Sequence, residues 1–138
     1  MPDLRIINRG IGADVIGNEL PADDKRGVLK RLDESIVKCA PRDVFLLIGI
    51  NDLGDNHTPE TMEAGYREIL ERVKKHAPDV RMHIQSVLPT RGTYAKHNAN
   101  VNDFNQRLPT LAKEFGYDYV DLHPKMTDET DEQNKKTT

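Results

Sequence analysis

The sequence has 138 residues, of which 36% are hydrophobic, 31% are charged and nine are glycine. This length fits one domain, and the composition is that of a folded chain rather than a disordered one. The net charge of −3 lacks the basic excess of a nucleic-acid binder. No apolar run approaches the ~18 residues of a membrane span. A single cysteine, Cys39, excludes an internal disulfide framework and a cysteine-rich zinc site.

The first half of the chain alternates strand-like and helix-like segments. Residues 4–7 form a short β-branched run that ends in turn residues. Apolar residues at helical spacing then predict a helix over 24–39, with Asp23 or Asp24 as its N-cap. Residues 43–49 are a continuous apolar run, typical of a strand that is buried on both faces in a parallel sheet.

The second half continues the alternation. Thr58 and Pro59 have the order of an N-cap and a first-turn proline, Pro109 is expected to kink or divide the helix that contains it, and Gly116 is expected to cap that helix. The predicted elements are a helix over 58–77, a strand over 80–88, a helix over 100–115 and a strand over 117–122.

The predicted order is β-α-β-α-β-α-β, which indicates parallel βαβ crossovers and an α/β fold. We expect residues 1–126 to form this α/β core. Residues 127–138 contain no apolar side chain and are predicted to be a polar tail or loop.

Ligands of an open parallel sheet bind at the carboxyl ends of its strands, so the loops after the strands are the candidate sites. Gly10-x-Gly12 is not a dinucleotide fingerprint, because the next glycine comes at Gly17. After the second strand, Gly49 would let a substrate approach the backbone. Asn51 would either donate a hydrogen bond to a developing oxyanion or form a local Asx-type turn with Asp52.

Four segments occur in an order that resembles the SGNH (GDSL-type) serine ester hydrolases: residues 8–14, 31–33, 47–54 and 85–89. The resemblance covers about residues 4–126, and its most specific part is Gly49-Ile50-Asn51-Asp52. It implies a flavodoxin-like three-layer α/β/α sandwich with a parallel sheet. It also implies hydrolysis of acyl or acetyl esters of sugars, lipids or small alcohols, with no cofactor and no metal.

The resemblance also implies site residues. Asn51 matches the side-chain donor of the oxyanion hole. The glycine that donates its backbone N–H falls on Ala13, directly after Gly12. Alanine keeps the N–H group, but a positive φ at this position would be costly for it.

Two blocks of the family pattern are missing, namely the Gly-Asp-Ser segment of the nucleophile and the Asp-x-x-His segment of the base. The two serines do not replace the nucleophile, because Ser35 lies within a predicted helix and Ser86 within a predicted strand. His123 is a weak candidate base, since it follows Asp121 with Asp-x-His spacing. We therefore expect a sandwich that is incomplete at both ends, carries the oxyanion half of the site and is inactive alone.

The other reactive side chains favour structural roles. His57, His76 and His97 are predicted to lie on solvated surface segments, and His83 to be packed within a strand. The histidine spacing does not suggest a metal site. Cys39, at the end of a predicted helix, is expected to be a small packed residue.

In the family's sheet order, a strand that this sequence lacks would lie between residues 4–7 and 43–48. Unpaired strand edges of this kind invite association, so a homo-oligomer is expected as one outcome. No leader sequence opens the chain, and because the true N-terminus is expected to precede Met1, no compartment is assigned.

Three functions remain open from the sequence. The first is ester hydrolysis on a small-molecule, carbohydrate or lipid ester, and the second is a non-catalytic binding module of the same fold. A flavodoxin-like cofactor protein is the weakest, because 5% aromatic residues and no tryptophan offer little to stack on a flavin ring.

Overall fold

The computed structural model describes residues 3–17 and 20–126, and its centre is a parallel sheet of three strands. The strands are β1 (Asp43–Leu46), β2 (Arg81–Gln85) and β3 (Asp118–Val120), arranged in the order β1-β2-β3. The register places Phe45 opposite His83 and His83 opposite Asp118. The parallel sheet and the last three predicted strands are confirmed. Each strand is shorter than the range predicted for it.

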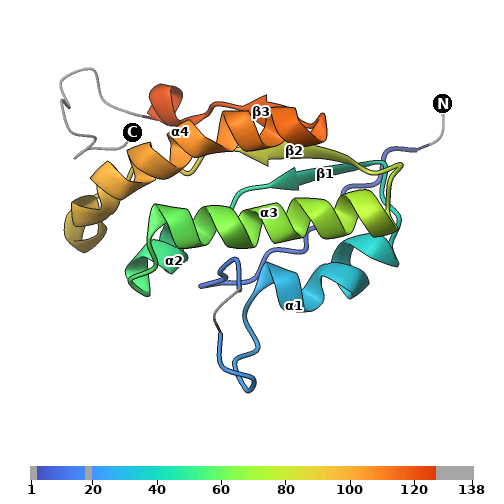
Figure 1. Ribbon diagram of the computed structural model, residues 1–138, viewed down its shortest axis with the longest axis horizontal. Helices are drawn as coiled ribbons and strands as arrows, with labels where there is room; N and C mark the ends of the chain where they lie inside the picture. The colour runs from blue at the N-terminus through green and yellow to red at the C-terminus, as the bar shows by residue number, and fades with distance from the viewer. Residues whose placement is uncertain (1–2, 18–19, 127–138) are drawn as a thin grey trace.

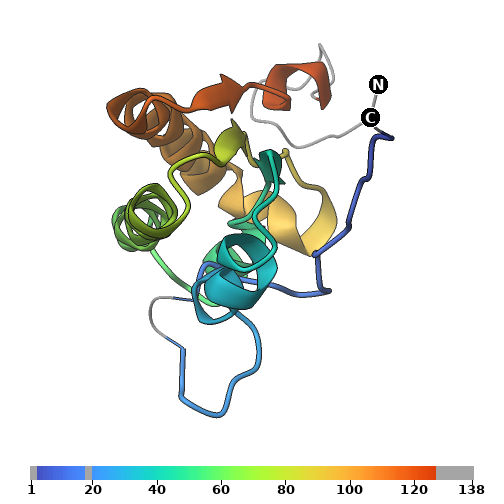
Figure 2. The same ribbon diagram turned by 90° about the vertical axis from the view of Figure 1, so that its right-hand side faces the viewer.

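Two long helices, α3 (Pro59–His76) and α4 (Asn98–Phe115), lie side by side against one face of the sheet (Figure 1). α1 (Val28–Leu32) continues into a π-helical turn, η1 (Asp33–Val37), and both pack beside α3 (Figure 2). The short helix α2 (Ile50–Gly54) follows β1, and the 3₁₀ turns η2 (Gly92–His97) and η3 (His123–Met126) precede α4 and follow β3.

The core lies between this sheet face and the helices. Its members come from the helices, from the π-helical turn η1 and from β1 and β2, and they include the fully buried side chains Leu32, Met62, Tyr66, Ile69, Leu70, Met82, Ile84, Phe104 and Leu108. Burial of such apolar area is the main favourable term in folding, at roughly 25 cal/mol per Å². No helix in the described part of the chain is long and apolar enough to cross a membrane.

The predicted helix signals of the second half are present in the structure. The Thr58 hydroxyl accepts a hydrogen bond from the Thr61 N–H at 3.2 Å, and Gly116 ends α4 in the left-handed conformation with φ 70°. Pro109 does not divide α4. Pro109 has no N–H to donate to the carbonyl of Asn105, four residues earlier in the helix. That carbonyl instead accepts a 3.4 Å hydrogen bond from the Tyr119 hydroxyl.

The start of the first helix was predicted wrongly. α1 begins at Val28, and its N-cap is Gly27 rather than Asp23 or Asp24. The Asp24 carboxylate instead binds the backbone N–H and the guanidinium of Arg26. The first N–H groups of α1 donate to the carbonyls of Val15 and Ile16, at 2.9 and 3.1 Å, so a distant loop replaces the expected side-chain cap.

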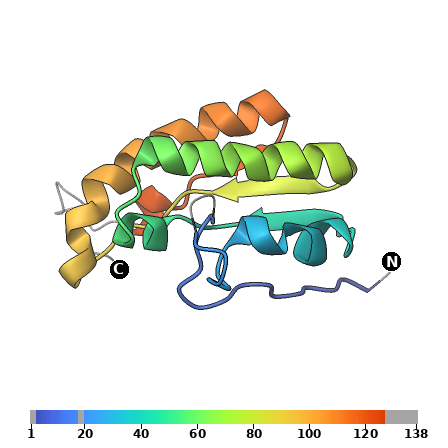
Figure 3. The same ribbon diagram turned by 60° about the horizontal axis from the view of Figure 1, so that its bottom comes forward.

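Residues 4–7 do not form the predicted strand. Leu4, Ile6 and Ile7 are 76%, 87% and 65% exposed, and residues 3–10 run as an extended segment along the outside of the molecule (Figure 3). A strand needs a neighbour for its backbone hydrogen bonds. Within the described residues β1 pairs with β2 alone, so its other edge stays open, and residues 4–7 do not pair with it because the family's sheet order places a further strand between the two.

The prediction that residues 43–49 are buried on both faces is also wrong for this structure. Leu46 and Ile48 are buried, whereas Phe45 and Leu47 are 65% and 40% exposed. Phe45 stacks on His83, with ring centroids 4.5 Å apart, on the sheet face opposite the core. The described chain is therefore an α/β fold with a parallel sheet, and it is an incomplete α/β/α sandwich. The predicted polar tail, 127–138, lies outside the described residues.

Candidate oxyanion site

The candidate site forms where the chain leaves β1 and turns into α2. Gly49 occupies this turn with φ 137°. A Cβ atom on Gly49 would lie 3.0 to 3.2 Å from side-chain carbons of Met62, Val87 and Phe104. The expectation that this glycine admits a substrate is therefore wrong, because a close approach to the core and a positive φ account for it.

Asn51 and Asp52 reach across to residues 13–16 rather than forming a local turn. The Asn51 Nδ2 group donates to the Asp14 carbonyl at 3.0 Å. The Asp52 carboxylate accepts from the Ile16 N–H, at 3.0 and 3.2 Å to its two oxygens. Both contacts span more than thirty residues of sequence. Since the Asn51 amide nitrogen carries two hydrogens, one donation to Asp14 leaves the second for a ligand.

Ala13 has the left-handed conformation that was expected to be costly, with φ 60°. Gly12, by contrast, has no positive φ, and a methyl group added to it would meet no atom within 4 Å. Both residues are exposed. In the segments 3–17 and 20–126, no hydrogen bond engages the Ala13 N–H, so this backbone donor is accessible next to the carbonyl that Asn51 holds.

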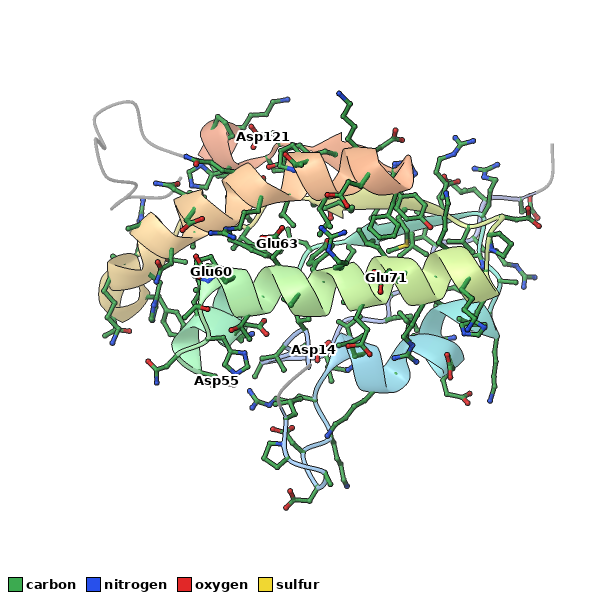
Figure 4. All side chains as sticks on the ribbon, in the orientation of Figure 1. Asp14, Asp55, Glu60, Glu63, Glu71 and Asp121 are labelled. Atoms are coloured by element: carbon green, nitrogen blue, oxygen red, sulfur yellow. The ribbon has the colours of Figure 1, made fainter. Side chains whose placement is uncertain are left out.

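Asp14 fixes the loop from the other side, next to α1 (Figure 4). Its carboxylate accepts from the Gly27 N–H at 2.8 Å and forms an ion pair with Arg31 at 2.7 Å. Burial raises the pKa of Asp14, but the hydrogen bonds from Arg31 and Gly27 outweigh this effect, and the pKa lies below its ordinary value. Asp14 and Arg31 stand in the segments that carry the resemblance, but the residue pattern assigned neither of them a role.

Asp52 is fully buried, and burial raises its pKa to about 6 despite the hydrogen bond from the Ile16 N–H. His57 is the nearest cation-forming side chain, with Nδ1 3.8 Å from Asp52 Oδ1. The prediction that His57 is solvated is wrong, because its side chain is 14% exposed. The spacing between these two residues gives no signal in the sequence, since the turn after α2 brings them together.

The two serines have structural surroundings. Ser86 is fully buried, and its hydroxyl accepts hydrogen bonds from the N–H groups of Leu122 and His123, at 2.8 and 2.9 Å. Ser35 lies half-buried on η1. Burial lowers the pKa of His123, which would favour the neutral imidazole that a general base requires. The backbone N–H of His123 bonds to Ser86, which directly follows β2. The role of His123 as a base stays a prediction.

The remaining reactive side chains lie elsewhere. His83 is packed, as predicted, between the carboxylates of Asp43 and Asp118, at 2.9 and 3.2 Å. Cys39 is exposed, so its predicted packing is wrong. His97 is half-buried beside Tyr94. Over residues 3–17 and 20–126, no three His, Cys, Asp or Glu side chains are grouped to hold a metal ion.

A pocket of about 390 Å³ lies beyond α2, between the first turns of α3 and α4. Its lining is largely polar and consists of Leu53, Asn56, His57, Thr58, Pro59, Glu60, His97, Asn100 and Asp103. Glu60 and Asp103 are held by the same guanidinium, that of Arg107, at 2.7 Å each, which organises the acidic side of the pocket.

Solved structures with similar folds are esterases and lipases. The native aryl esterase of M. smegmatis aligns with a TM-score of 0.74 and 16% identity over 94% of this chain and 67% of its own. A catalytic mutant of an acetylxylan esterase from Geobacillus stearothermophilus aligns at 0.65, with 17% identity over 86% of this chain and 54% of its own.

A GDSL-like lipase from Bacteroides thetaiotaomicron aligns at 0.66, with 20% identity over 80% of this chain and 55% of its own. The chain thus spans about half the length of several structures that it resembles. No curated protein matches the sequence. The model of the GDSL-like lipase/acylhydrolase family matches residues 2–137, and the chain belongs to that family.

Proposed function

We propose that this chain forms the oxyanion-stabilising part of a serine ester hydrolase that cleaves acyl or acetyl esters. The observation that carries the proposal is the hydrogen bond from Asn51 Nδ2 to the Asp14 carbonyl, at 3.0 Å. It holds a side-chain amide donor next to the accessible N–H of Ala13. Membership of the family and the fold shared with an aryl esterase and an acetylxylan esterase support the same reaction class.

The two donors would act when charge develops on the carbonyl oxygen. A serine hydroxyl attacks the acyl carbon and passes its proton to a histidine, while the carbonyl π electrons move onto oxygen. Asn51 Nδ2–H and Ala13 N–H would donate to that oxyanion. The histidine then returns the proton to the leaving alcohol as the tetrahedral intermediate collapses, and water repeats the sequence to release the acid. Loss of one such donor typically costs about 2.7–4 kcal/mol of transition-state stabilisation.

We infer that neither serine of this sequence is the nucleophile. The Ser86 hydroxyl accepts two backbone N–H bonds in the core, and Ser35 lies on η1, away from the strand ends. Treatment of the folded 138-residue chain with a fluorophosphonate is therefore expected to give no adduct in its intact mass. An adduct that maps to either serine by peptide sequencing would overturn this assignment.

The oxyanion donors are tested without turnover, by titrating the ¹⁵N-labelled chain with methanesulfonate, a tetrahedral anion that does not titrate near neutral pH. The expected result is a saturable shift of the Ala13 amide and the Asn51 side-chain amide. Asn51→Ala should abolish the shift at Ala13, and Asn100→Ala, in the neighbouring pocket, should preserve it. A wild-type chain whose Ala13 amide does not respond would contradict the proposed function.

A non-catalytic binding module of the same fold is the second candidate. The occupied hydroxyl of Ser86 favours it, because within the described residues neither serine is placed as a nucleophile. Fluorophosphonate labelling of the natural protein, followed by intact mass and peptide mapping, separates the two. A labelled serine would identify a hydrolase, whereas methanesulfonate binding at Ala13 in a protein with no labelled serine would identify the binding module.

A further inference from the structure

The groups of the 13–16 loop are almost all held by contacts from other elements. The Asp14 carbonyl is held by Asn51, the carbonyls of Val15 and Ile16 accept from the first N–H groups of α1, and the Asp14 carboxylate is held by Gly27 and Arg31. One further contact comes from inside the core. The Ile16 N–H of the loop donates a hydrogen bond to the Asp52 carboxylate.

The acceptor in that contact, the Asp52 carboxylate, is an unusual group in a protein core. Asp52 is a fully buried residue of α2 and directly follows Asn51 in the chain. A carboxylate in a core is costly unless it is paired, and here the groups that oppose its charge are the backbone N–H of Ile16, its own backbone N–H and the His57 ring at 3.8 Å. A smaller or apolar residue would fill a core position at lower free energy. What Asp52 supplies instead is a charged acceptor that reaches a backbone donor 36 residues away.

We propose that Asp52 is a positioning residue, whose carboxylate holds the 13–16 loop so that the Ala13 N–H and the Asn51 amide point to one oxyanion. This inference rests on the proposed function, in which those two groups are the donors. Asp52 itself touches no substrate. Asp52 acts on both donors indirectly. It holds Ile16, which is three residues from Ala13, and it is the neighbour of Asn51 in α2.

The charge state of Asp52 gives the proposal a pH signature. The groups that face its carboxylate are the Ile16 N–H from the loop, its own backbone N–H, His57 from the segment after α2, and Asp55 at the end of α2, whose negative charge raises the Asp52 pKa. Protonation of Asp52 near pH 6 would replace a charge-assisted hydrogen bond with a weaker neutral one. The Ile16 amide should then report the titration of a side chain remote in sequence.

The first test reads the contact itself. In the ¹⁵N-labelled chain the Ile16 amide shift is expected to titrate with a midpoint near pH 6, and the titration should vanish in Asp52→Asn. Asp79→Asn, which changes an exposed carboxylate before β2, should leave it intact. Amide hydrogen exchange at Ile16 should accelerate about tenfold in Asp52→Ala, relative to amides of α3. An Ile16 amide that is unaffected in both Asp52 variants would overturn the proposal.

The second test reads positioning, through methanesulfonate affinity at Ala13. We expect Asp52→Ala to weaken binding about tenfold and Asp52→Asn, which keeps an acceptor oxygen, to restore most of it. Unchanged affinity in Asp52→Ala would overturn the positioning role. If the wild-type Ala13 amide fails to bind the anion while Ile16 still titrates, the proposed function fails and the Asp52 contact stands. If Asp52→Ala does not fold, methanesulfonate affinity at pH 5 and pH 7.5 replaces it: affinity should fall at pH 5 in wild type and not in Asp52→Asn, and an equal fall in both would overturn the positioning role.

Discussion

The carboxyl end of β1 and the sheet face opposite the core differ in how their residues are held. At its carboxyl end, Asn51 and Asp52 bind a loop that in turn anchors the start of α1. On the face opposite the core, Phe45 and Leu47 are exposed, and residues 4–7 run unpaired along the outside. The contrast shows that long-range polar contacts can organise a site even where the sheet around it is incomplete.

This difference has a physical basis. A hydrogen bond between a buried carboxylate and a backbone N–H is directional and is satisfied by two groups alone. A sheet face needs a whole layer of apolar side chains, and a strand edge needs a second strand. The carboxyl-end site can therefore form from residues 13–54, whereas the open face at Phe45 cannot be completed by the helices that the structure describes.

The largest expected effect is at the turn that begins the site. Gly49→Ala places a methyl group 3.0 to 3.2 Å from three core side chains on a residue with φ 137°. Strain and overpacking together predict a loss of roughly 3–5 kcal/mol in the free energy of unfolding. Urea denaturation of Gly49→Ala against Gly12→Ala measures it, since a methyl at Gly12 meets no atom within 4 Å. Equal stability of the two variants would contradict the packing argument.

The Gly49 turn also shows what sequence patterns can and cannot predict. The apolar run before it, the N-cap at Thr58 and the cap at Gly116 are local signals, and each locates an element correctly. The segment 4–7 carries the same kind of local signal and fails, because a strand depends on a partner that no local pattern encodes.

The candidate site was predictable in part for the same reason. Asn51 and Ala13 are assigned through resemblance to a family, whose ordered segments record which loops meet, and their role as oxyanion donors stays a prediction. The roles of Asp14, Asp52 and His57 were missed, because each depends on a contact with a residue at another point in the chain or on burial after a turn. A residue pattern gives the identity of such a group but not the direction in which its side chain points.

The second effect concerns pH. The pKa of Asp52 is raised to about 6 in the folded state, so between its unfolded value near 4 and pH 6 the folded chain binds a proton that the unfolded chain does not. Stability attributable to this group therefore falls as pH rises from about 4 to 7, by roughly 3 kcal/mol at most. Comparison of urea midpoints at pH 5 and pH 7.5 should show this fall in wild type and its loss in Asp52→Asn. A fall of equal size in Asp52→Asn would assign it to another group.

A smaller loss is expected from the ion pair that holds the loop against α1. Arg31→Met leaves the Asp14 carboxylate, which is 9% exposed, without its partner and should cost about 2 kcal/mol at neutral pH. Because Arg31 and Gly27 hold the Asp14 pKa below its ordinary value, the cost should shrink as pH falls below about 4. Lys38→Met breaks an exposed pair with Glu34 and should change stability far less than Arg31→Met does. Similar losses in both variants would contradict the role of burial.

The smallest effect on folding is expected on the open face. Phe45→Lys replaces a side chain that is 65% exposed but stacks on His83, so the free energy of unfolding should change by about 1 kcal/mol or less. The same change should reduce self-association, because it puts a charge on an unpaired edge strand that exposes apolar side chains. Sedimentation velocity over a range of concentrations measures this, with Tyr94→Lys as the control, since Tyr94 is 41% exposed on η2, away from β1. Association that persists in Phe45→Lys, or is lost equally in Tyr94→Lys, would mean that copies of the chain meet through another surface. A selective loss would show that copies of the chain meet through the exposed face of β1 that carries Phe45.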